Sequence, residues 1–281
     1  MRVFISVDME GVAGVATFDQ IIRGGTGYAR AQELMTEEAN AAIRGAFTGG
    51  ATEVLVNDSH GTMDNLLHDR LDPRARLVFG APRPSCMVQG ITSDDAMAVF
   101  VGYHAAAGAE GVLAHTFSSN FTEVRVNGLP VTEAEVNGLY AASLGVPVAV
   151  LTGDDQICGV ASKAFPGVTA VEVKQAHGFS ATDTLSPSVA RERIEDAVRT
   201  AVGNRGELRS QPLPDRLDLE IDFALPLGAD LAGTVPGSVR LAGRTLRAEA
   251  RDVQELLGFV MSWYYLAMIA AQQHASLAAR R

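Results

Sequence analysis

The stretch that decides the fold is MRVFISVDMEG, residues 1–11 of the chain. Its nearly continuous apolar run, residues 3–7, is typical of a strand buried on both faces of a parallel sheet. A single arginine and a short apolar run ending in an acid predict a first strand and not a signal peptide. Asp8 and Glu10 are two residues apart, so an extended backbone points both carboxylates to the same side, and Gly11 lets the chain turn away.

Four further valine-rich runs have the same character and predict more buried strands: residues 53–56, 97–101, 148–151 and 168–173. The segments between them predict helices over residues 28–47, 132–144 and 188–202. The second of these helices opens with a capping box at Thr132 and Glu135. This alternation predicts a layered α/β domain in which helices flank a mostly parallel sheet.

The pattern changes after about residue 211. Residues 217–223 and 238–248 alternate like antiparallel strands, and a long helix follows from residue 252 to about Ala279. We therefore expect an α/β domain over 1–205 and a smaller α+β unit over 206–281 that ends in the long helix. The apolar stretch 256–271 falls short of the roughly 20 residues that a bilayer span needs, so we expect a buried helix, with a subunit interface as a second use.

Composition narrows the possible partners. The 281 residues carry a formal net charge of −10, which argues against nucleic acid or an anionic membrane, because both select basic surfaces. Cys86 and Cys158 are far apart and form no C-x-x-C pair, which suits a reducing compartment and offers no obvious thiolate ligand. We expect a cytoplasmic protein with neither a nucleic-acid nor a membrane partner.

Acids and imidazoles follow the predicted strands. The first strand runs into Asp8 and Glu10, the second into His60 and the third into His104. Ligands of open α/β sheets bind outside the carboxyl ends of the strands, where these side chains converge. Glu133 begins a helix, where the dipole favours an anion. The five residues together predict a metal site.

Charge counting favours two metal ions over one. The three carboxylates contribute −3, two divalent ions would contribute +4, and a bridging hydroxide would balance the remainder, as in two-metal hydrolases. A mixed oxygen and nitrogen ligand set without thiolate fits Zn²⁺ best, with Mn²⁺ or Co²⁺ as substitutes.

Each residue alone has a structural explanation. An acid pair after a strand often binds magnesium or caps a helix, His60 could be a turn residue, and His104 could be a core histidine; only their joint arrangement favours the metal site. Asp154 and Asp155 suit a helix N-terminus. His115, expected on a short strand, is the best candidate for acid–base or nucleophilic chemistry because it follows a proposed ligand closely.

The motifs resemble the D-aminopeptidase family of dipeptide-transport operons, peptidase family M55. The resemblance rests on SVDMEG (6–11), MTEEAN (35–40), VLVNDSH (54–60), GYH (102–104) and GDD (153–155), with VKQ (173–175) and LSP (185–187) later. It implies a zinc-dependent peptidase that releases N-terminal D-amino acids, above all D-alanine, from short peptides. It also implies two zinc ions on Asp8, Glu10, His60, His104 and Glu133, with Asp8 shared between them, and His115 as the catalytic residue.

The same resemblance implies a cytoplasmic, ring-like homodecamer. Substrate preference stays open, because Ala105 to Ala107 stand where the resemblance places a basic residue, and L-peptides or another small amide are alternatives. Two other classes also remain: a magnesium phosphohydrolase, although no phosphate-binding glycine loop is present, and a non-catalytic peptide-binding protein with a structural metal. Structural zinc sites are usually cysteine-rich, which this set is not.

Overall fold

The computed structural model describes residues 1–278, which fold into two compact units. Unit 1 comprises residues 1–105, 110–113 and 137–213, and unit 2 comprises residues 106–109, 114–136 and the chain from Pro214 onward. The sequence suggested two consecutive domains, 1–205 and 206–281. The structure differs because a mid-chain segment, 114–136, belongs to the smaller unit.

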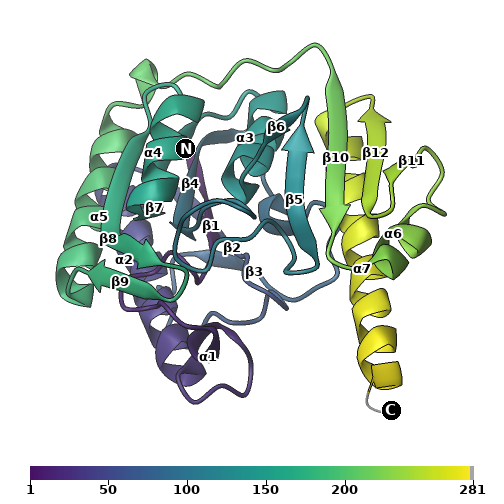
Figure 1. Ribbon diagram of the computed structural model, residues 1–281. Coiled ribbons are helices and arrows are strands. Elements are labelled where there is room, and N and C mark those ends of the chain that lie inside the picture. Colours follow the sequence, from purple (N-terminus) through teal and green to yellow (C-terminus); the bar gives the residue numbers. More distant parts are fainter. Residues whose placement is uncertain (279–281) are drawn as a thin grey trace. The chain divides into compact units, whose positions relative to one another are not determined.

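Unit 1 is built on a seven-stranded sheet in the order β3-β2-β1-β4-β7-β8-β9 (Figure 1). All neighbouring strands run parallel except β9, which is antiparallel to β8. The strands are β1 (Arg2–Val7), β2 (Glu53–Asp58), β3 (Arg76–Val78), β4 (Asp95–Tyr103), β7 (Val148–Asp154), β8 (Thr169–Gly178) and β9 (Ala181–Thr184). This confirms the predicted α/β class with a mostly parallel sheet.

Helices connect these strands. They are α1 (Phe18–Ile21), α2 (Tyr28–Thr48), α3 (Glu133–Ser143), α4 (Asp155–Ala164) and α5 (Pro187–Gly203), with one-turn 3-10 helices at Cys86–Val88 and Arg205–Glu207. The first turn of α3, residues 133–136, is assigned to unit 2. The three predicted helices appear as α2, α3 and α5. The capping box of α3 forms as predicted, since Thr132 N–H donates to Glu135 Oε2 at 2.8 Å and Glu135 N–H donates to Thr132 Oγ1 at 3.1 Å.

The two faces of β1 pack against different layers. Val3, Ile5 and Val7 join the apolar cluster formed with α2 and α5, whereas Phe4 and Ser6 point to the other face because side chains alternate along a strand. All five side chains are buried, which explains why the strand is apolar apart from Arg2 and Ser6. Burial on both faces fixes its register, since a slip of one residue would exchange the two sets.

Unit 2 contains an antiparallel sheet in the order β11-β12-β10-β5-β6 and two helices. Its elements are β5 (Phe121–Val126), β6 (Leu129–Pro130), β10 (Leu217–Phe223), α6 (Pro226–Ala232), β11 (Val239–Ala242), β12 (Thr245–Ala250) and α7 (Val253–Ala278). Every second residue of β10 is buried, which is the alternation that predicted this strand. The predicted end of the long helix, about Ala279, lies outside the described residues.

The C-terminal apolar stretch, residues 256–271, lies within the longer helix α7. Within residues 1–278, α7 is the helix long and apolar enough to cross a membrane, judged by length and composition. Its residues Leu256, Val260 and Trp263 are buried, and the Trp263 ring packs 6.1 Å from that of Phe223 on β10. Packing against the sheet of unit 2 accounts for this apolar composition, as the prediction of a buried helix required.

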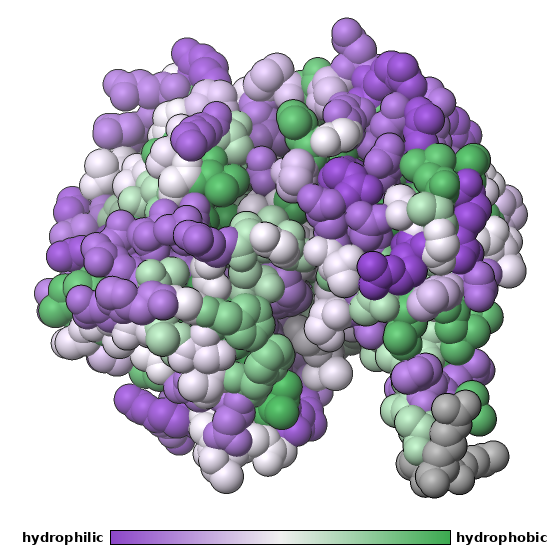
Figure 2. Space-filling model, viewed as in Figure 1, coloured by the Kyte–Doolittle hydropathy of each residue, from purple (hydrophilic) through white to green (hydrophobic). Residues whose placement is uncertain are grey.

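The opposite side of α7 is partly apolar as well. Tyr265, Ile269 and Leu277 are large hydrophobic residues that stay exposed on this helix. Figure 2 shows hydrophobic surface along α7 between polar side chains. A subunit interface on this helix, the second use expected from the sequence, stays a prediction.

Candidate metal centre

Three neighbouring strands deliver four of the predicted ligands to one edge of the unit 1 sheet. Asp8 and Glu10 follow β1, His60 comes two residues after β2, and His104 comes directly after β4. Because β2, β1 and β4 are adjacent and parallel, their carboxyl ends meet. Each of the four residues is at least nine-tenths buried.

Asp8 lies between the two histidines. Its Oδ1 is 3.3 Å from Nδ1 of His60, and its Oδ2 is 3.3 Å from Nε2 of His104. Glu10 Oε2 lies 2.9 Å from the same His60 nitrogen. The ligand atoms of Asp8, Glu10 and His104 all lie within 4.8 Å of one another, a spacing that could hold a metal ion.

The second nitrogen of each imidazole faces a backbone carbonyl. Nε2 of His60 is 2.8 Å from the carbonyl oxygen of Ile21, and Nδ1 of His104 is 3.0 Å from that of Ala105. A carbonyl only accepts, so this nitrogen donates its N–H, while the other nitrogen faces the carboxylates and would offer its lone pair to a metal ion once its proton is lost. Metal-ligating histidines have this arrangement, in which the outer hydrogen bond fixes both tautomer and ring orientation.

The electrostatics also favour a cation. Burial and the charge of Glu10 raise the pKa of Asp8, although contacts with the two histidines oppose the rise. Burial lowers the pKa of His60, but Glu10 and Asp8 outweigh it and hold that pKa well above its usual value. Oδ2 of Asp8 is buried without a hydrogen-bond partner among the described residues. A divalent cation would neutralise the two acids and occupy this oxygen, so the residues fit a metal such as zinc.

Asp58, whose role the sequence left open, supports the loop that carries His60. Its Oδ2 accepts hydrogen bonds from the backbone N–H groups of Asn65 and Leu66, both at 2.6 Å, and Asn65 Nδ2 donates to its Oδ1 at 2.9 Å. The same Nδ2 donates to the carbonyl of His60. Backbone and amide donors thus satisfy both oxygens of Asp58, which makes it a structural acid.

Asp154 and Asp155 also serve the backbone. Asp154 caps α4 by accepting from Ile157 N–H at 3.0 Å, and its other oxygen accepts from Val112 N–H at 2.8 Å. Asp155 accepts from Ala176 N–H at 2.7 Å. Both residues therefore have the structural role that their position before a helix favoured.

Close backbone packing fixes the turn after β1. A Cβ atom on Gly11 would lie 2.0 Å from the carbonyl oxygen of Tyr103, and one on Gly102 would lie 2.4 Å from that of Asp8. Gly11 N–H donates to Gly102 O at 2.7 Å. Neither Gly11 in the turn nor Gly102 near the end of β4 therefore has room for a side chain.

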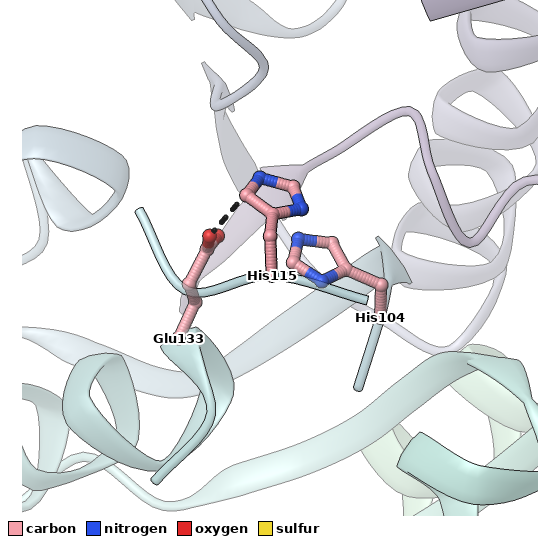
Figure 3. Close-up of side chains that lie close together, drawn as sticks. All are labelled: His104, His115 and Glu133. Atoms are coloured by element: carbon pink, nitrogen blue, oxygen red, sulfur yellow. Dashed lines mark ion pairs between the residues drawn. The ribbon is translucent and has the colours of Figure 1, made fainter. Parts of the chain in front are cut away.

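The remaining two predicted residues come together in unit 2. Glu133 is the first residue of α3 and is buried, and its Oε1 lies 3.6 Å from Nε2 of His115 (Figure 3). The same oxygen accepts from Phe117 N–H at 2.6 Å. The His115 side chain keeps 27% of its surface exposed, so a substrate can reach it.

The expected short strand at His115 was wrong. Residues 112–115 form a turn and an irregular segment, followed by an isolated bridge between Thr116 and Ser118. Phe117 has a φ of 59°, a left-handed conformation that is costly for an aromatic residue and is found mainly where function or local structure requires it. The hydrogen bond from its N–H to Glu133 helps to hold this conformation.

Two residues at the edge of the sheet were missed as contributors. Lys174 on β8 and Glu38 on α2 are both buried and both contact the turn after β1. In the sequence they stand only within the motifs MTEEAN (35–40) and VKQ (173–175). Nothing in their local pattern marks them, since charged residues in a strand or helix usually face solvent.

The fold of unit 1 and its cluster of acids and imidazoles define an α/β protein with a candidate metal site. Its sequence matches the family described as Peptidase_M55, D-aminopeptidase, over residues 1–262. It is 36% identical to a D-aminopeptidase of Bacillus subtilis (strain 168) over 269 residues, covering 95% of this chain and 98% of the relative. The chain therefore belongs to the D-aminopeptidase family, which confirms the resemblance and the predicted peptidase class.

A solved structure agrees with this assignment. The chain is similar to the Zn-dependent D-aminopeptidase DppA from Bacillus subtilis, described as a self-compartmentalizing protease, with a TM-score of 0.92 and 36% identity. The match covers 95% of this chain and 98% of that chain. A likeness of this extent supports the fold of both units individually.

Proposed function

We propose that this protein is a zinc-dependent aminopeptidase that removes an N-terminal D-amino acid from short peptides. One observation carries the metal dependence. The carboxylate of Asp8 lies between two imidazoles, and each imidazole has its outer nitrogen fixed by a backbone carbonyl. The preference for D-residues comes from the family, whose characterised relative is named a D-aminopeptidase.

Asp8 would be a ligand of two zinc ions in the proposed centre. Its Oδ1 lies beside Glu10 and His60, and its Oδ2 lies beside His104. We assign Glu133 as the further ligand of the second ion, as the resemblance to the family implies. Two such ions would supply a nucleophile at neutral pH and polarise the peptide carbonyl.

His115 is the proposed proton carrier. Glu133 lies 3.6 Å from its Nε2 and so orients the imidazole. From this position His115 hands a proton to the leaving amine, which otherwise departs poorly at neutral pH. Nucleophilic attack or stabilisation of the oxyanion by His115 are the alternatives, and single-turnover kinetics with a search for a covalent adduct distinguish them.

A substrate panel with metal analysis tests the proposal. We expect about two zinc ions per chain, cleavage of D-Ala-D-Ala well above L-Ala-L-Ala, loss of activity with a chelator and recovery on adding zinc. Equal turnover of the L-dipeptide would move the assignment to a related amide. Magnesium-dependent cleavage of phosphate esters, or bound metal with no turnover on any peptide, would overturn it.

We also propose a cytoplasmic, ring-like homo-oligomer, a decamer, with the active sites inside. The relative's description as a self-compartmentalizing protease supports an assembly of this kind. The two cysteines, Cys86 and Cys158, are buried and are not joined to each other by a disulfide, which suits a reducing compartment. Light scattering coupled to size-exclusion chromatography measures the assembly, and a monomeric, fully active protein would contradict it.

A further inference from the structure

The turn after β1, residues 8–15, carries two of the four unit 1 ligands but has no regular secondary structure. Its conformation must therefore come from contacts with other elements, and Glu10 can lie beside His60 only while those contacts hold. The close packing of Gly11 against Gly102 fixes one point of the turn. The rest of the turn depends on side chains from β8 and α2.

Lys174 on β8 supplies most of these contacts. Its ammonium donates hydrogen bonds to the carbonyl oxygens of Glu10, Val12 and Val15, at 2.5, 3.0 and 2.6 Å. The three N–H groups of an ammonium are thus all used, each on a different peptide of the same turn. The side chain forms no ion pair within 4.0 Å in the described part of the chain, and the residue is 2% exposed.

A buried lysine bonded only to carbonyls is uncommon, because removing the charge from water is costly. Burial lowers the pKa of Lys174 to about 8, while the acids Asp154, Glu38, Glu10 and Asp8 act in the opposite direction. A neutral side chain of the same length would avoid this cost if Lys174 merely filled space. The use of all three donors on carbonyls of one turn indicates that the donors themselves are needed.

Glu38 on α2 contacts the same turn through one of its backbone N–H groups. Its Oε1 accepts from Ala13 N–H at 2.9 Å. The N–H and C=O groups of the turn are therefore fixed by side chains from two different elements. An arginine would not reproduce these contacts. The donors of a guanidinium lie in one plane, whereas the three carbonyls surround the ammonium of Lys174.

We propose that Lys174 is a positioning residue for the metal centre: its ammonium gathers the Glu10, Val12 and Val15 carbonyls and so holds the Glu10 carboxylate beside His60. The inference rests on the proposed function, because it assigns Glu10 and His60 to a zinc ion. Lys174 does not touch the substrate or the metal in this role. It acts only through the backbone of the turn.

The test compares Lys174→Met with Lys163→Met. These are the two lysines of the chain, and Lys163 lies exposed near the end of α4. Methionine keeps the length of the side chain and removes all three donors. We expect Lys174→Met to weaken zinc binding, measured by competition with a chromogenic chelator, by about 10–100-fold, the usual cost of losing an outer contact of a metal ligand. Lys163→Met should bind zinc as the parent protein does.

Hydrogen exchange gives a second readout that needs no metal. Amides of residues 9–15 should exchange faster in zinc-free Lys174→Met than in the zinc-free parent, whereas the strands of unit 2 should not change. Unchanged zinc affinity and unchanged exchange, even with a lowered melting temperature, would overturn the proposal. If the parent itself binds no zinc, the proposed function fails, but the exchange of the turn still decides whether Lys174 positions it.

If Lys174→Met does not fold, Lys174→Gln provides a milder test, because glutamine keeps two donors. It should show the same changes in zinc affinity and exchange to a smaller extent. Parent-like zinc affinity in Lys174→Gln would also overturn the proposal, because a neutral amide cannot gather three carbonyls. Rescue of Lys174→Met by higher zinc concentration, with kcat recovering to the parent value, would support a positioning role.

Discussion

The two units each gather acids around one point, but they differ in how the negative charge is balanced. In unit 2, Arg125 on β5 pairs with Glu123, with Glu220 at 3.3 Å and with Asp222 at 2.8 Å. In unit 1, Asp8 lies between two imidazoles, and no arginine or lysine is paired to it within the described residues.

The contrast distinguishes structural acids from functional ones. Burial raises the pKa of Asp222, but the hydrogen bonds from Arg125 and Thr245 and the nearby arginine charges together outweigh it and leave that pKa below its usual value. The pKa of Asp8 moves the other way, because burial and the neighbouring Glu10 dominate. In unit 2 an arginine balances the acids permanently, whereas in unit 1 imidazoles lie beside them, and a bound cation would take over that role. Substitutions in both units can break or refine this contrast.

The largest effect is expected for Asp8→Asn. The amide keeps the size of the side chain but removes the charge that both halves of the proposed centre share. We expect loss of most bound zinc and a decrease in kcat/KM of about 1,000-fold or more, as for removal of a principal metal ligand. Metal analysis and dipeptide kinetics measure both. Asp222→Asn is the matched control in unit 2, and equal zinc loss in the control would break the comparison.

His115→Ala is expected to separate catalysis from metal binding. Loss of a general acid or base typically lowers kcat by about 100- to 10,000-fold. Zinc content should stay at the parent value, because His115 is not among the proposed ligands. A variant with full activity would remove His115 from the mechanism, and a variant that lost a zinc ion would make it a ligand instead.

Glu38 differs from both groups of acids, because within residues 1–278 it is neither paired with an arginine nor one of the proposed metal ligands. Its Oε2 is buried without a hydrogen-bond partner among the described residues, and burial raises the pKa of its carboxyl to about 7. Between the unfolded value near 4.5 and the folded value near 7, the folded state holds more protons than the unfolded state. Stability should therefore fall as the pH rises through this window and change no further above it.

Glu38→Gln removes this titration. At pH 8 we expect the free energy of unfolding of the variant to exceed that of the parent by up to about 3 kcal/mol, because a pKa difference of one between the folded and unfolded states corresponds to about 1.4 kcal/mol. At pH 4 the two proteins should be alike. Urea denaturation of both zinc-free proteins at several pH values measures the difference. A parallel pH dependence in the two proteins would exclude Glu38 as its source.

The smallest effect is expected for Arg125→Met. The Arg125 side chain is 16% exposed and its partners are about a quarter to a third exposed, so the cluster lies between surface and buried ion pairs. We expect the free energy of unfolding to fall by roughly 1–2 kcal/mol. Zinc content and kcat/KM should remain within twofold of the parent. A large loss of zinc would show that this cluster is not purely structural.

The sequence predicted that the acids and imidazoles of unit 1 lie together, because parallel strands align their carboxyl ends. Once residues 3–7, 53–56 and 97–101 are buried strands, Asp8, His60 and His104 follow at one edge without further information. Nothing comparable predicts Lys174, because its three partners are backbone carbonyls more than 150 positions earlier. A contact with a backbone carbonyl cannot be predicted from residue types, because every residue has such a carbonyl.

The composition of unit 2 could not be predicted for a related reason. Strand β5 pairs antiparallel with β10, joining Val126 to Leu219 and Phe121 to Phe223. Pairing between segments so far apart depends on the whole fold, and the residues between 114 and 136 have no pattern that excludes them from the first domain. The late strands β10 to β12 were predictable because their alternation and their turn are local.

The carbonyl partners of the two imidazoles have a consequence for how this site can vary. Ile21 and Ala105 contribute through the main chain, so side-chain substitutions would leave both hydrogen bonds in place. Both side chains are buried, so such substitutions would report the packing at these positions and not the contribution of the carbonyls. Detecting their contribution requires editing the peptide bond itself, for example by replacing the amide between residues 21 and 22 with an ester, whose carbonyl is a weaker acceptor.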